Sequence, residues 1–182
     1  MKKLFLLSIV FLGFGLGVRA SAATYYVAKT GSDANTCSQA LPCLTIAKGV
    51  SKLVSGDILI IKAGTYVENI GPGIPGGTSW RTATTIKTNA GDTVVIRPTT
   101  GAAVDIRATG QQYIVFGGPA SNEGFVVDCT DTAIAGDYTG VAIQDAAHHI
   151  RVQHNEVKNC AWSKAKRGPA TVDNILYADH IM

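Results

Sequence analysis

The residues best suited to chemistry lie together late in the chain, in the stretch HHIRVQHNEVKNC, 148–160. This stretch holds His148, His149, His154 and Cys160. Imidazole and thiolate are common ligands of transition metals, and imidazole is also a proton acceptor near neutral pH. The stretch is therefore either a metal or catalytic site or one coil of a repeating structure.

The elements that must position these residues are short. β-Branched runs of three to five residues, separated by Gly, Asn and Asp, indicate strands. The expected strands are Tyr25–Lys29, Ile58–Lys62, Thr84–Thr88, Thr93–Arg97, Ala103–Arg107, Tyr113–Phe116, Phe125–Asp128, Val141–Gln144, Ile150–Gln153 and Glu156–Lys158, with a further candidate at Asn174–Tyr177. One segment differs, because Leu44–Val54 places Ile46, Val50, Leu53 and Val54 on one face of a helix.

Three of the short strands recur in the same order. VDI (104–106) matches VAI (141–143), IVF (114–116) matches IRV (150–152), and GFVVDC (124–129) matches NEVKNC (155–160). The offsets are 37, 36 and 31 residues. Three strands repeating at a period in the thirties are typical of one coil of a parallel β-helix. The amphipathic helix then suits a cap over the apolar N-terminal end.

This repeat predicts which residues stack on successive coils. The predicted inward stacks are Ile150 and Val152 under Ile114 and Phe116, and Val157 under Val126.

The same alignment places Gly124 and Asn155 at one tight corner. Both residue types tolerate a left-handed backbone, which such a corner is expected to require. It also stacks Asp128 on Asn159, and a polar corner ladder is favoured there over a catalytic site.

The four cysteines suggest disulfides. Cys37 and Cys43 enclose a polar turn that suits a local bridge. Cys129 and Cys160 fall at equivalent positions of successive coils, and strands about 4.8 Å apart match the Cα spacing of a disulfide. A bridge is favoured for this second pair, with two stacked free thiols as the alternative. No Cys-x-x-Cys pair supports a zinc site.

Residues 1–22 have the composition and order of a secretory signal peptide, with Lys2 and Lys3 before a fifteen-residue apolar run and a small-x-small end. We therefore expect a secreted, cell-surface or periplasmic protein, with no membrane span after cleavage. Removing Lys2, Lys3 and Arg19 leaves 13 basic and 13 acidic residues. A net-neutral mature chain gives no electrostatic signal for nucleic acid.

The segment YYVAKTGSDANTCSQALPCLTIAKGVSKLVSGDILIIKAGTYVENI and the following ATTIKTNAGDTVVIRP resemble secreted right-handed parallel β-helix proteins of the pectate-lyase-like superfamily. The resemblance covers about residues 24–160. It implies an all-β fold: a right-handed parallel β-helix with three short strands per coil and an N-terminal capping helix. It also implies that residues 23–182 hold the cap and about four coils with an incomplete C-terminal end, a fragment of a protein that is a monomer when intact.

For function, the resemblance implies an exported protein that interacts with polysaccharide, with acidic polyuronate favoured. The parent would be a lyase acting by β-elimination, with glycoside hydrolysis second. A non-catalytic adhesin or carbohydrate-binding protein is the alternative. A lyase would need calcium and a Lys or Arg base; a hydrolase would need two carboxylates. No cofactor site is evident in this chain itself. The catalytic candidates are weak: Asp128, Asp131, Asp137, Asp145, Arg151 and Lys158.

Two further expectations concern exposed side chains. Trp80 and Trp162 could stack on sugar rings or pack locally. In the strand around Ile150, His149 and Arg151 point away from the core, so the histidines are not expected to converge. The stretch 148–160 is thus interpreted as two strands and a corner of one coil.

Overall fold

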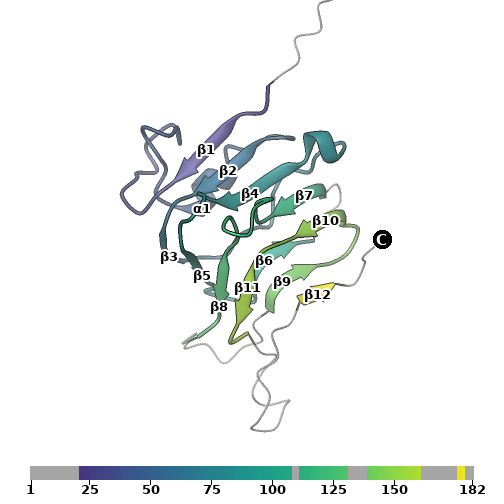
Figure 1. The fold of residues 1–182 in the computed structure, drawn as a ribbon. Coiled ribbons are helices and arrows are strands. Elements are labelled where there is room, and N and C mark those ends of the chain that lie inside the picture. Colours follow the sequence, from purple (N-terminus) through teal and green to yellow (C-terminus); the bar gives the residue numbers. More distant parts are fainter. Residues whose placement is uncertain (1–20, 108–110, 131–138, 161–175, 179–182) are drawn as a thin grey trace, which may run out of the picture.

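The chain winds into a right-handed parallel β-helix of about four coils, which confirms the fold class (Figure 1). The structure is a computed structural model that describes residues 21–107, 111–130, 139–160 and the strand 176–178. Most of the expected signal peptide, Asp131, Asp137, Trp162 and most of the C-terminal end lie outside these residues. Within them, no helix is long and apolar enough to cross a bilayer.

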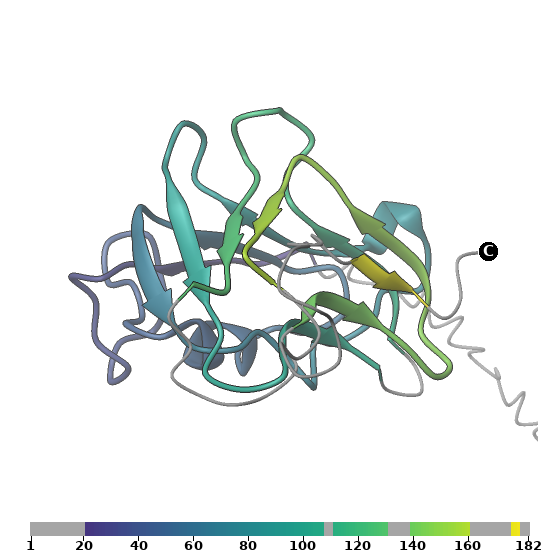
Figure 2. The same ribbon diagram turned by 90° about the horizontal axis from the view of Figure 1, so that it is seen from below.

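Three parallel sheets run along the solenoid. Sheet A contains, in order, β1 (Thr24–Val27), β2 (Ile58–Ile61), β4 (Thr84–Thr88), β7 (Gln112–Phe116) and β10 (His148–Val152). Sheet B contains β3 (Gly64–Val67), β5 (Val94–Arg97), β8 (Val126–Asp128) and β11 (Glu156–Lys158); sheet C contains β6 (Ala102–Ile106), β9 (Thr139–Ile143) and β12 (Leu176–Ala178). Figure 2 shows the coils following one another from the purple N-terminal end to the yellow β12.

Each sheet contributes inward rows of side chains to a common core, and one row from each sheet shows the pattern. The rows are Leu59, Ile86, Phe116 and Val152 in sheet A, Tyr66, Ile96, Val127 and Val157 in sheet B, and Ile70, Val104 and Val141 in sheet C. Most of these side chains are fully buried. Burying an aliphatic or aromatic side chain stabilises a fold by about 1.5–3 kcal/mol, so the stacked rows are the main source of cohesion between coils.

The predicted stacks of Ile150 on Ile114 and Val152 on Phe116 are confirmed, but the prediction for Val157 is wrong by one residue. Val157 pairs with Val127, and Glu156 pairs with Val126. A shift of one residue exchanges the two faces of a strand.

The inserted residue that caused the error is Asn159. It has a left-handed φ of 58° and lies between the paired strand and Cys160. The cysteines are therefore 31 residues apart while the strands are offset by 30, and an alignment anchored on the cysteines misplaces the strand.

The corner at Gly124 and Asn155 forms for reasons other than a left-handed backbone, since neither residue has a positive φ. A Cβ on Gly124 would lie 1.6 Å from the carbonyl oxygen of His154, so close backbone approach requires glycine. His154 is the left-handed residue, with φ 57°. Asn155 accepts a hydrogen bond from the Phe125 amide at 2.8 Å and donates to the Phe116 carbonyl at 2.9 Å.

The N-terminal cap is a shorter helix than expected. Helix α1 (Ile46–Val50) ends at Ser51, so Val54 lies outside it and is 64% exposed. Its inner face still covers the first coil, because Ile46 is buried and Gly49 lies directly against the side chains of Val27 and Leu59. The Glu68 carboxylate accepts hydrogen bonds from the first amides of the helix, Ile46 and Ala47.

Both expected disulfides are present. Cys37–Cys43 closes the turn before α1, and Cys129–Cys160 joins successive coils, with Cα–Cα distances of 4.6 and 4.8 Å. Disulfides persist in oxidising compartments, so the two bridges are compatible with an extracellular location.

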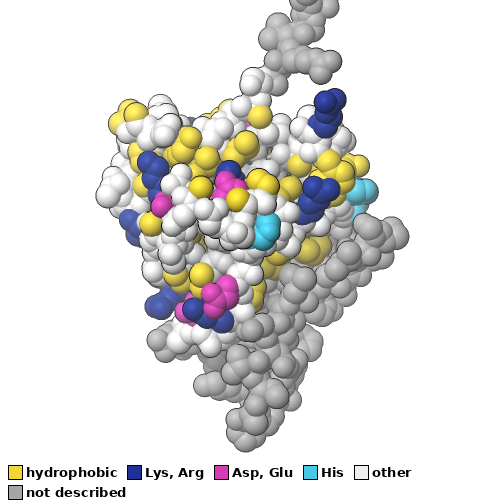
Figure 3. All heavy atoms as spheres, in the orientation of Figure 1, with side chains coloured by type: hydrophobic (Ala, Val, Ile, Leu, Met, Phe, Trp, Pro, Cys, Tyr) yellow, Lys and Arg dark blue, Asp and Glu magenta, His cyan; other side chains and the backbone are white. Residues whose placement is uncertain are grey.

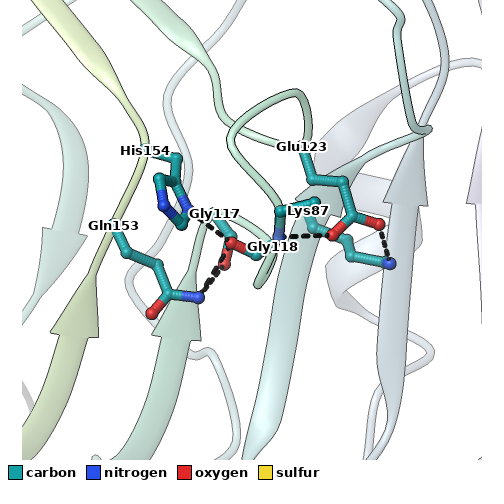
Figure 4. Close-up of polar contacts among 7 residues, drawn as sticks. Lys87, Gly117, Gly118, Glu123, Gln153 and His154 are labelled. Carbon is teal, nitrogen blue, oxygen red and sulfur yellow. Dashed lines mark hydrogen bonds and ion pairs between the residues drawn. The ribbon is translucent and has the colours of Figure 1, made fainter.

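The loop 117–124, which the second repeat lacks, is fixed from both sides (Figure 4). The Glu123 carboxylate accepts hydrogen bonds from the Lys87 ammonium and from the Ala120 amide. On the other side, Nδ1 of His154 lies 2.9 Å from the Gly118 carbonyl oxygen. The hydrogen bond from Lys87, followed by that from Ala120, lowers the pKa of Glu123 below its ordinary value.

We predict that Asn155→Ala destabilises the protein by about 1–3 kcal/mol. The change leaves the Phe125 amide without its partner and removes one of the two donors to the Phe116 carbonyl, which keeps the Gln153 amide. The urea midpoint of the oxidised protein measures this loss. Asn122→Ala is the matched control: Asn122 is exposed, and the change should stay within about 0.5 kcal/mol. Equal losses for both variants would contradict the assigned role of Asn155.

We also predict that Glu123 makes stability depend on pH. A carboxyl whose pKa is lowered on folding adds stability above its unfolded pKa, about 4.3, and this is lost as the pH falls through the folded pKa. Glu123→Gln should therefore be less stable than wild type at pH 7, and the difference should shrink toward pH 3. Thermal midpoints across this range measure it, with the exposed Glu156→Gln as control. If the difference in thermal midpoint between Glu123→Gln and wild type does not shrink from pH 7 to pH 3, the prediction is wrong.

Candidate functional site

Two neighbouring coils share an unusual backbone conformation near the start of their strands in sheet A. Tyr113 in β7 has φ 51°, and His149 in β10 has φ 56°. A left-handed residue other than glycine costs roughly 1–2 kcal/mol. The strand pairing passes from His148–Gln112 to Ile150–Ile114, so the two kinked residues lie at the same level of successive coils. Their rings stack on each other, with centroids 4.6 Å apart.

Trp80 completes this group from the preceding coil. It begins the short 3-10 helix η1 (Trp80–Thr82) just before β4. Its ring meets Tyr113 edge-on at 5.3 Å, and the Arg151 guanidinium lies 3.8 Å from its ring centre. We call Trp80, Tyr113, His149 and Arg151 the aromatic ledge. Three successive coils therefore each supply one ring to a common surface.

The ledge is accessible and positively charged. Trp80 is 39% exposed, and His149, Arg151 and the neighbouring Arg81 are also exposed. The ion pairs found among the described residues lie elsewhere and involve neither arginine. Figure 3 shows a hydrophobic patch bordered by basic side chains and a histidine on the side where η1 and β10 lie in Figure 1.

This arrangement suits binding better than proton transfer. An indole ring offers a flat apolar surface with a polar edge, and a guanidinium can bind a carboxylate through two parallel hydrogen bonds. The ledge contains no carboxylate that could act as a general acid or nucleophile. A sequence scan detects Trp80 and Arg151 separately, but their contact depends on the position of η1, which no periodicity marks.

Asp128 is a structural residue in the polar corner favoured from the sequence. Its carboxylate accepts hydrogen bonds from the Asn159 amide at 2.8 Å and from the Thr130 backbone amide at 3.0 Å. Burial alone would raise the pKa of Asp128, but the hydrogen bonds from Asn159 and Thr130 outweigh it and lower the pKa. A carboxylate held in its ionised form by three donors is poorly suited to accept a proton.

The remaining catalytic candidates do not form a cluster in the described part of the chain. Lys158 pairs with Glu156 at 3.5 Å on the surface, and Arg151 belongs to the ledge. Asp145 is exposed in the turn before β10 and has a left-handed φ of 56°. Across residues 21–107, 111–130 and 139–160, no group of three or more His, Cys, Asp or Glu side chains could hold a metal ion.

The sequence does not predict the ion pair between Asp105 and Arg107. Asp105 in β6 is buried, and its carboxylate pairs with Arg107, whose Nε donates at 2.7 Å. The other carboxylate oxygen of Asp105 is buried with no hydrogen-bond partner. The side chain of Asp105 lies on the opposite face of β6 from the inward side chains of Val104 and Ile106. Residues outside the strand bury it, and the sequence of β6 does not indicate this.

The three histidines separate into two places. His148 and His149 lie together, with their Nδ1 atoms 2.6 Å apart, which differs from the expectation that the histidines stay apart. His154 lies at the corner, where it contacts Gly118.

Comparisons with known proteins add little to this geometry. No protein-family model matches the chain, and no curated protein matches it. A solved structure of XylC in complex with xylose is similar, at 38% identity over 41% of this chain, with a TM-score of 0.39. The match covers 11% of the XylC chain. A match of this extent assigns the chain to no family.

Proposed function

We propose that this chain belongs to an exported β-helix protein that binds polysaccharide, with acidic polyuronate as the preferred class. The single observation that carries the proposal is the aromatic ledge. An exposed Trp80, backed by Tyr113 and covered by the Arg151 guanidinium, combines a surface for a sugar ring with a cation for a carboxylate.

The strain at the ledge supports a role in binding. Tyr113 and His149 both adopt a costly left-handed conformation within a sheet whose other strands are regular. Such outliers concentrate at functional sites. The kinks interrupt the alternation of β7 and β10 at one level of the solenoid, and the two rings stack there.

Binding, rather than catalysis, is the function proposed for the described coils. Asp128 is engaged by Asn159 and Thr130, and Lys158 by Glu156. If the whole protein is a lyase that cleaves polyuronate by β-elimination with calcium, its acid cluster belongs to other coils, and the ledge would hold the polymer beside it. If the whole protein is a glycoside hydrolase, its catalytic carboxylates likewise belong to other coils, and the ledge would hold the polymer. A non-catalytic adhesin would need only the ledge.

We predict that the chain binds polygalacturonate and that Trp80→Ala weakens binding by about tenfold or more, because the exposed ring is lost. Arg151→Gln should weaken binding to polygalacturonate while leaving binding to a neutral galactan nearly unchanged, because only the uronate offers a carboxylate. Isothermal titration calorimetry on both polymers measures these changes.

Leu41→Ala is the matched control, since Leu41 is an exposed apolar residue of the cap, 53% accessible, and remote from the ledge in sequence. Far-ultraviolet circular dichroism checks that each variant is folded. Unchanged affinity in both Trp80→Ala and Arg151→Gln would reject the ledge as the binding surface. Ultraviolet absorbance of unsaturated products, recorded on the same samples, separates a lyase from a binding protein.

A further inference from the structure

We infer that His148 and His149 form a binding site for a divalent transition-metal ion of the zinc or copper type. This inference shares His149 with the aromatic ledge but does not rest on polysaccharide binding. It rests on two imidazole nitrogens that face each other at 2.6 Å, although the residues are consecutive in a β-strand.

The left-handed backbone at His149 makes this contact feasible. Successive side chains of a regular strand point to opposite faces, so adjacent imidazoles cannot normally meet. In β10, φ of 56° at His149 breaks this alternation, and the two rings lie 4.8 Å apart at a steep mutual angle of 75°. The protein therefore holds two Nδ1 atoms on the same side of one strand.

The spacing of these nitrogens is close to that of a chelating pair. Zinc binds imidazole nitrogen at about 2.0–2.1 Å, so two ligands at an angle between 90° and tetrahedral lie about 2.9–3.3 Å apart. The observed 2.6 Å needs an increase of less than about 1 Å. In the metal-free protein, one Nδ1–H donates to the other Nδ1; in the complex, both imidazoles are neutral at Nδ1 and direct a lone pair at the ion.

Surrounding contacts hold the pair in place while leaving it accessible. The His149 ring stacks on Tyr113, and the His148 amide donates to the Gln111 carbonyl at 3.2 Å. His148 is half-buried and His149 is exposed, so an ion can reach the site from solvent. Since no third His, Cys, Asp or Glu of the described residues joins them, water or a ligand oxygen would complete the coordination.

The chemistry of the pair selects among metals. Two imidazoles suit zinc, copper or nickel, whereas calcium and magnesium require several oxygen ligands. The charged group of the ledge, the Arg151 guanidinium beside Trp80, is a cation and offers no oxygen ligand to a metal ion. Thiolates of the described cysteines do not compete for the ion, because these cysteines are in disulfides. The site should therefore bind Zn²⁺ and show no response to Ca²⁺.

The test is calorimetric titration of the full chain, without a polyhistidine tag, with Zn²⁺ and separately with Ca²⁺. We expect one saturable Zn²⁺ site that weakens about tenfold or more in His148→Asn and in His149→Asn, and no Ca²⁺ binding. Asparagine tolerates a left-handed backbone, so His149→Asn keeps the kink. His154→Asn is the matched control and should retain full Zn²⁺ affinity.

The absence of saturable Zn²⁺ binding to the wild-type chain would overturn the inference, and so would binding that survives both His148→Asn and His149→Asn. Loss of binding in His154→Asn to the same extent would place the metal elsewhere and also reject it. Trp80→Ala should still bind Zn²⁺, so failure of the metal site and failure of polysaccharide binding give separate results.

Discussion

Each coil of this protein is stabilised by the coil next to it. The strand pairs of the described residues are parallel and join segments of different coils, so the backbone hydrogen bonds of one coil are completed by its neighbours. The inward rows follow the same register, as Ile86 packs between Leu59 and Phe116. A coil by itself would bury neither its backbone groups nor its apolar side chains.

This dependence explains the residues that look exceptional at the corners and at the N-terminal end. Where two backbones approach most closely, at Gly124 against His154, no side chain fits. Where the turn leaves the Phe125 amide without a strand partner, the Asn155 side chain accepts its hydrogen bond and also donates to the Phe116 carbonyl of the preceding strand. At the N-terminal end of the described coils, α1 covers Val27 and Leu59. Each feature satisfies a requirement of the stack at a point where strand pairing cannot.

The stack is also the part of the molecule that the sequence predicts well. Stacked strands need similar apolar residues at similar spacing, so VDI and VAI, or IVF and IRV, repeat visibly and pair as expected. The error at Val157 arose because Asn159 adds one residue between a strand and a cysteine, and letters alone do not show which side of the corner takes the insertion. The predicted helix was too long because the helical spacing of apolar residues continues through Val54, although the helix ends at Ser51.

The outer surface obeys no such constraint, and there the sequence is a poor guide. Solvent accepts almost any residue on the outside of a coil, so Tyr113 and His149, although 36 residues apart like their strands, are different residue types. Trp80 and Arg151 have no matching residues on the neighbouring coils that would mark them. They meet only because η1 folds back toward sheet A and because two coils kink at the same level. The core needs none of these features, and the two kinks cost conformational energy. A surface that the fold does not require, built at such a cost on three successive coils, supports the proposal that a ligand contacts it.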